Sequence, residues 1–111
     1  MFRIHMLPAR DGDCLIVETG NPADPHRILI DGGRRDTLDA ILARIGGWMP
    51  RATPVDLMVL THVDADHVEG LLAYLVTASS PAVGGIWLNG LNQELKDDHK
   101  SSFIMVNCLK T

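Results

Sequence analysis

Apolar and polar residues group into short runs over the first third of the chain, a pattern typical of β-strands separated by turns. Strands are predicted at 2–7, 14–19 and 26–31, because each run is rich in apolar residues and stops at a Pro or Gly. The intervening segments 10–13 and 20–25 are rich in Gly, Pro, Asn and Asp, which favour turns. The chain therefore opens as a series of strands joined by short connections.

Helical spacing follows. Leu38, Ile41, Leu42 and Ile45 recur at the period of an α-helix, and Asp36 or Thr37 is positioned to cap its start. A strand is predicted at 55–61. A second helix is then expected to begin with Asp66 as its N-cap, with Glu69 completing a capping box, and to run to Val76. With another strand at 84–88, the predicted order is β-β-β-α-β-α-β, a mixed-sheet α/β fold.

Three of the predicted strands contain apolar runs, at 14–17, 57–60 and 86–88, that indicate cover on both faces of the sheet. Two helices cover only one face, so the other is expected to form an apolar patch and to allow self-association. Trp48 and Trp87 are predicted to lie in the core. Beyond position 90, a polar helix is predicted at 91–100, and the apolar run 103–109 fits either a strand or a helix.

Composition places the chain among ordinary globular domains. It has 111 residues, 46% hydrophobic and 22% charged, with a net charge of −4, so a single domain over 1–111 is expected. The acidic balance argues against stable nucleic-acid binding. No signal sequence or membrane span is recognisable, and Cys14 and Cys108 lack zinc-type spacing. The sequence therefore predicts a cytoplasmic protein without a membrane partner.

Candidate chemistry is concentrated at the junction between the strand at 55–61 and the second helix. Two imidazoles and three carboxylates fall within eight residues, with no Lys or Arg among them: His62, Asp64, Asp66, His67 and Glu69. Carboxylates at such spacing repel one another unless a cation lies between them. Imidazole nitrogens and carboxylate oxygens are ligands of zinc and other first-row metals. The segment therefore predicts a metal site.

Other metal motifs fit this segment poorly. The two histidines are five residues apart, whereas H-E-x-x-H on a helix needs four. A calcium loop starting at Asp64 would place Glu69 at the position that requires Gly. Two local alternatives stay open. Asp66 and Glu69 are either helix caps alone or part of the metal site, and capping and ligation are compatible. Asp31, before two glycines, is either a turn former or a residue that orients the site.

The segment 62–67 (H-V-D-A-D-H) resembles the H-x-H-x-D-H motif of metallo-β-lactamase-fold hydrolases, with Asp64 in place of the second His. The strands at 12–17 and 29–33 resemble earlier elements of the same fold. The T-H-x-D-x-D-H form is similar to a branch that includes lactamase-like domains of competence-type DNA-uptake proteins. The resemblance covers residues 4–90.

This resemblance implies a metal-dependent hydrolase, in which activated water attacks an ester or phosphodiester of a small-molecule or phosphodiester substrate. His62, Asp64, Asp66 and His67 would hold up to two divalent ions, with Asp66 also orienting the water and Asp31 orienting the ligands. Zinc is the expected metal, but the extra carboxylate also admits manganese, iron or magnesium.

The resemblance further implies a four-layer αββα sandwich, of which this chain corresponds to the N-terminal half. The family's remaining ligands lie in the second half, and no matching motif follows position 90. A truncated product is therefore expected. The alternative to an active hydrolase is an inactive or binding-only remnant that keeps the half-site.

Overall fold

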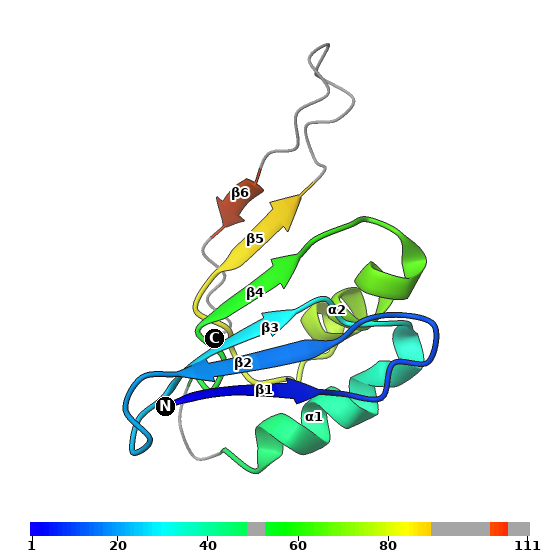
Figure 1. The fold of residues 1–111 in the computed structure, drawn as a ribbon. Coiled ribbons are helices and arrows are strands. Elements are labelled where there is room, and N and C mark those ends of the chain that lie inside the picture. Colours follow the sequence, from blue (N-terminus) through cyan, green and yellow to red (C-terminus); the bar gives the residue numbers. More distant parts are fainter. Residues whose placement is uncertain (49–52, 90–102, 107–111) are drawn as a thin grey trace.

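The computed structural model describes residues 1–48, 53–89 and 103–106. They form one six-stranded sheet with strands in the order β1-β2-β3-β4-β5-β6 and two α-helices (Figure 1). The elements in chain order are β1 (Phe2–Met6), β2 (Leu15–Thr19), β3 (His26–Ile30), a 3-10 turn η1 (Arg35–Thr37), α1 (Leu38–Gly46), β4 (Leu57–Leu60), α2 (Ala65–Val76), β5 (Ile86–Asn89) and β6 (Phe103–Val106).

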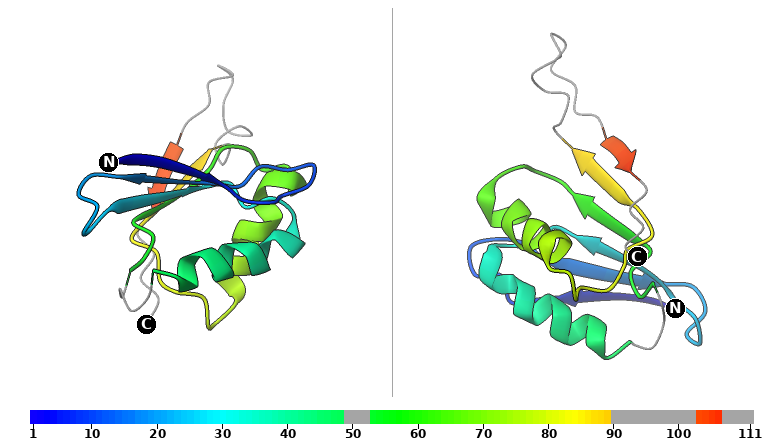
Figure 2. Two further views of the ribbon diagram at one scale, coloured as in Figure 1. Left: turned by 60° about the horizontal axis from the view of Figure 1, so that its bottom comes forward. Right: turned by 180° about the vertical axis from the view of Figure 1, so that it is seen from behind.

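The sheet is mixed, and this confirms the predicted α/β class. β1, β2 and β3 pair antiparallel as a meander, β3, β4 and β5 run parallel, and β6 returns antiparallel to β5. The two parallel pairings require crossover connections, which α1 and α2 supply. Both helices lie on the same face of the sheet (Figure 2).

Most predicted elements are confirmed, and the run at 103–109 contains a strand rather than a helix. The predicted helix at 91–100 lies outside the described residues. Several strand bounds differ from the predicted ones by one or two residues, and the predicted start of the second helix was wrong, because α2 begins at Ala65 with Asp64 as its N-cap, not Asp66. The reason is that the Asp64 carbonyl already accepts hydrogen bonds from the backbone N–H groups of His67 and Val68.

The hydrophobic core lies between the sheet and the two helices. Ile16, Leu29 and Met58 point from the sheet into it, and Ile41 and Tyr74 meet them from α1 and α2; all five are fully buried. Within the described residues, the opposite face of the sheet carries no helix (Figure 2). This arrangement holds the carboxyl ends of β3 and β4 side by side beneath the start of α2.

The two tryptophans differ from one another. Trp48 is half-buried against the core, whereas Trp87 is 40% exposed on the helix-free face, so its predicted core position was wrong. Side chains alternate between the two faces of a strand. Because its neighbours Ile86 and Leu88 face the helices, Trp87 points away from them. In the described ranges, no helix combines the length and apolar character needed to span a bilayer.

A buried ion-pair network lies on the helix-covered side, away from the candidate metal site. Glu18, on β2, is 3% exposed and binds His5 Nε2 at 2.5 Å and Arg27 Nε at 2.9 Å. The Arg27 guanidinium lies 4.0 Å from the centre of the Trp48 ring. Each buried charge is thereby compensated, which is the condition for keeping a carboxylate in the interior.

Candidate metal centre

Asp31 is the centre of the candidate site, at the carboxyl end of β3. It is 3% exposed and adopts a left-handed backbone conformation with φ of 57°. Its carboxylate accepts two hydrogen bonds from Thr61, at 2.7 Å from the backbone N–H and 2.5 Å from the hydroxyl. A non-glycine residue in this conformation costs on the order of 1 kcal/mol, so the surrounding contacts must hold it in place.

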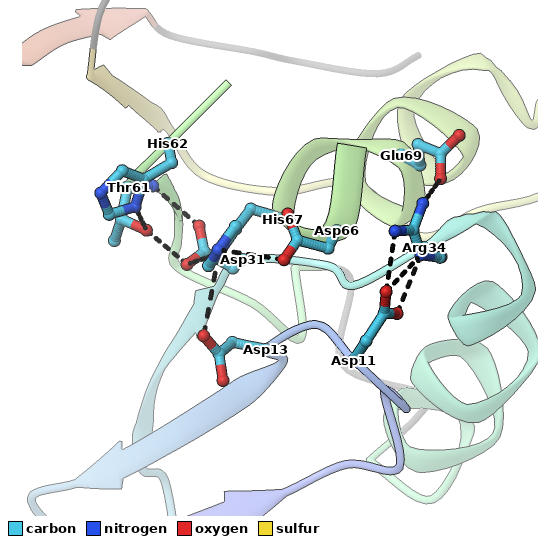
Figure 3. A network of polar contacts seen from close by, with 9 residues as sticks. All are labelled: Asp11, Asp13, Asp31, Arg34, Thr61, His62, Asp66, His67 and Glu69. Atoms are coloured by element: carbon cyan, nitrogen blue, oxygen red, sulfur yellow. Dashed lines mark hydrogen bonds and ion pairs between the residues drawn. The ribbon is translucent and has the colours of Figure 1, made fainter. Parts of the chain in front are cut away.

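His67, in the first turn of α2, points its ring at this carboxylate. Nδ1 of His67 lies 3.0 Å from Oδ2 of Asp31 (Figure 3). A carboxylate accepts a proton-bearing nitrogen, so the neutral imidazole keeps its proton on Nδ1 and its lone pair on Nε2. This is the arrangement by which carboxylates orient metal-binding histidines in proteins.

Thr61 fixes the tautomer of His62 in the same way. Its hydroxyl has one proton and donates it to Asp31, so its contact with His62 Nδ1 at 3.0 Å must be one in which the imidazole donates. His62 therefore also carries its proton on Nδ1 and its lone pair on Nε2. The two imidazole rings lie 5.1 Å apart between centroids. One buried carboxylate thus orients both candidate ligands.

Two further carboxylates face His67. Asp66 Oδ2 lies 3.8 Å from Nε2, and Asp13 Oδ2 lies 3.9 Å from Nδ1 (Figure 3). Burial lowers the pKa of His67, but the hydrogen bond to Asp31 and the charges of Asp31, Asp66 and Asp13 outweigh it, so the pKa lies above its usual range. The site therefore favours positive charge, whether a proton or a metal ion.

Asp64 occupies a different position from the other predicted ligands. It is exposed at the N-cap of α2, and its side chain makes no capping hydrogen bond to the helix. Among the described residues, no group of three or more His, Cys, Asp or Glu side chains is arranged to hold a metal ion as they stand. The structure brings together His62, Asp66 and His67 around Asp31, and leaves Asp64 at the rim.

The donor types at this junction are those that divalent metals take in proteins. They are the imidazoles of His62 and His67 and the carboxylate of Asp66, all at one strand-to-helix junction. The nearby cation is engaged elsewhere, since Arg34 binds Asp11 through two nitrogens, each 2.8 Å from a carboxylate oxygen, and Glu69 at 3.6 Å (Figure 3). Glu69 therefore pairs with Arg34, and the predicted capping box with Asp66 was wrong.

Three glycines lock the backbone around this junction. A Cβ on Gly12 would lie 2.0 Å from the Asp66 carbonyl oxygen, one on Gly32 would lie 2.4 Å from Leu71 N, and one on Gly70 would lie 1.8 Å from Gly32 O. The close approach allows direct hydrogen bonds, from Gly32 N to His67 O at 2.8 Å and from Gly70 N to Gly33 O at 2.9 Å. The first turns of α2 are thereby fixed to the loop after β3.

Sequence reasoning had missed several of these residues. Asp13 was interpreted as a turn residue, and Thr61 was given no role, yet both contact the orienting network. The positive φ of Asp31 was not predictable from the two glycines that follow it. The sequence did contain one indication of the role of Thr61. It directly precedes His62, and a hydroxyl at that position can reach the imidazole.

Comparison with models of protein families, with curated proteins and with solved structures gave no match to this chain. The resemblance to metallo-β-lactamase-fold hydrolases therefore depends on the motif at 62–67 and on the strand residues quoted for it.

Proposed function

We propose that this chain carries part of the active site of a metal-dependent hydrolase, of the metallo-β-lactamase fold, that acts on an ester or phosphodiester. The observation that carries the proposal is the double orientation of His62 and His67 by Asp31, directly in one case and through Thr61 in the other. Satisfying a buried carboxylate does not by itself require that two histidines, one exposed and one half-buried, share the same tautomer. A metal site needs that control.

The residues divide into ligands and a positioning group. His62 and His67 would present Nε2 to a divalent ion, and Asp66 would add an oxygen ligand. Asp64, at the rim, would add a second carboxylate. Asp31 would hold the imidazoles without touching the metal. When bound, the ion supplies a Lewis acid that lowers the pKa of water and polarises the bond under attack.

Asp66 is the proposed catalytic residue of the chain itself. It stands on the first turn of a helix whose backbone is fixed by Gly12 and Gly70, so its carboxylate has a defined position. A carboxylate so placed can accept a hydrogen bond from the attacking water and orient it. Zinc is the expected ion, and the carboxylate-rich donor set also suits manganese, iron or magnesium, with up to two ions per site.

The test is hydrolysis of a chromogenic phosphodiester and a chromogenic ester by the purified protein, after addition of zinc or manganese. Activity should disappear with a chelator and in Asp66→Asn, and should survive in His26→Ala, an exposed histidine at the opposite end of β3 from Asp31. Metal binding without turnover would instead favour the binding-only alternative. Turnover that neither chelator nor Asp66→Asn affects would refute the proposal.

A further inference from the structure

The face of the sheet opposite the helices is formed by one alternate set of residues from five neighbouring strands. Strand register places them in rows: Ile4 lies opposite Val17, which lies opposite Ile28, and Val59 lies opposite Trp87. The apolar members of this helix-free face are Phe2, Ile4, Met6, Leu15, Val17, Ile28, Ile30, Leu57, Val59 and Trp87.

On β1 to β4 this face has no Asp, Glu, Lys or Arg, and its polar members on these strands, Thr19 and His26, lie together at one end. Phe2 and Met6 are 69% and 80% exposed, although both are large apolar residues. The alternate positions on the same strands, such as Glu18 and Arg27, are buried beneath the helices. A half-covered sheet usually has an apolar covered face and a polar open face, whereas here the open face is apolar as well.

The uncovered apolar area is comparable to the apolar part of a stable interface. Phe2, Ile4, Met6 and Trp87 are 69%, 52%, 80% and 40% exposed, and at about 200 Å² for a large side chain these four leave on the order of 500 Å² of surface per chain. A standard interface takes about 800 Å² from each partner, of which a little over half is apolar. An apolar patch of several hundred Å² is often a site of association.

A second copy of the same chain fits this face on physical grounds. Two sheets pack face to face when their twists match, and two copies have the same twist by necessity. The net charge of −4 does not oppose the contact, because the face itself is uncharged. A two-fold axis brings each patch onto its equivalent, so one surface satisfies both sides.

We propose that the helix-free face is the interface with a second copy of this chain, giving a symmetric dimer with two sheets inside and helices outside. The proposal depends on the exposed face alone and not on the metal chemistry. The interface would include the centre of the sheet, and β1 would contribute its most exposed side chains.

The test is the dimer dissociation constant, measured by analytical ultracentrifugation. Wild type is compared with variants on β1 and with control variants on α2 at positions of similar exposed fraction. Ile4→Glu and Met6→Glu place a charge in the interface, at positions 52% and 80% exposed. Leu72→Glu and Val76→Glu place the same charge on the outer side of α2, at positions 52% and 75% exposed. The β1 variants should raise the dissociation constant about 100-fold or more, and the α2 variants should leave it unchanged.

Far-UV circular dichroism verifies that each variant folds. If the Glu variants fail to fold, Phe2→Ala and Met6→Ala remove apolar area without adding charge, and each should weaken the dimer about tenfold. A wild-type chain that stays monomeric at all concentrations would overturn the proposal and give the face to another occupant. A dimer that resists the β1 substitutions or dissociates with those on α2 would overturn it as well.

Discussion

The carboxylate of Asp31 lies 3.0 Å from Nδ1 of His67, although the two residues are 36 positions apart in the chain. The contact joins the end of β3 to the start of α2 and decides which nitrogen of His67 faces outward. It is maintained in spite of the positive φ of Asp31, which most side chains avoid. The geometry is what the proposed metal site requires of His67.

Removal of the Asp31 carboxylate should lower the affinity of the site for a divalent metal. Asp31→Gly relaxes the left-handed conformation but loses the acceptor, whereas Asp31→Asn keeps the shape and loses the charge. Both should reduce metal affinity by about 10–100-fold, as measured by isothermal titration calorimetry. The control is Asp39→Asn, on the exposed side of α1. Full affinity in Asp31→Gly would mean that the carboxylate has no orienting role.

Thr61 should matter through its hydroxyl alone. Thr61→Val keeps the side-chain shape but removes the bridge between Asp31 and His62, whereas Thr61→Ser preserves it. We expect metal affinity to fall about tenfold in the valine variant and to be close to wild type in the serine variant. Equal losses in the two variants would indicate that the methyl group, and not the hydrogen bond, is responsible.

Alanine substitutions at two helix glycines should have opposite effects on stability, because only one of these glycines lies against the backbone of another segment. An alanine Cβ at Gly70 would lie 1.8 Å from the Gly32 carbonyl oxygen, so Gly70→Ala should lower the free energy of unfolding by at least about 2 kcal/mol. Gly46, at the end of α1, has no heavy atom within 4 Å of such a Cβ. Gly46→Ala should therefore raise stability by about 0.5–1 kcal/mol. Urea denaturation measures both, and a neutral Gly70→Ala would contradict the close approach.

The buried network around Glu18 should make stability depend on pH in the acid range. Burial raises the pKa of Glu18, but hydrogen bonds from His5 and Arg27 outweigh it and leave the pKa below its usual value of 4.5. A lowered folded-state pKa stabilises the fold fully above the unfolded value, and this contribution is lost as the pH falls through the folded-state pKa.

Glu18→Gln isolates this contribution, because it removes the charge and leaves Arg27 buried without its partner. Its free energy of unfolding should be lower than that of wild type by about 3 kcal/mol at neutral pH. The difference should persist down to about pH 4.5 and shrink below it. Denaturant titrations at several pH values measure this, and a difference that does not change with pH would exclude an ionised Glu18.

The order of strands and helices was predictable because hydrophobic period is a local property. The runs that became β2 and β4 and the helical spacing that became α1 each depend on a few adjacent residues. The grouping of His62, Asp66 and His67 was also predictable, since they lie within six residues. The start of α2 was not, because Asp64 and Asp66 are equally good caps by composition.

The remainder of the site arises from contacts between distant segments, which leave little trace in local sequence. Asp13 and Asp31 approach His67 because β2 and β3 are neighbours in the sheet. The pairing of Arg34 with Asp11 depends on the fold in the same way. In the sequence, Gly12 looks like any turn glycine and Gly70 like any helix glycine. Only their distances to the Asp66 and Gly32 carbonyl oxygens show that no side chain fits there.

The most direct test of the central claim is the metal content of the protein, measured by inductively coupled plasma mass spectrometry after dialysis against trace zinc and manganese. The claim predicts bound divalent metal in wild type and in His26→Ala, and a loss of most of it in His62→Ala and His67→Ala. Absence of bound metal in wild type, or equal metal content in all four proteins, would contradict it.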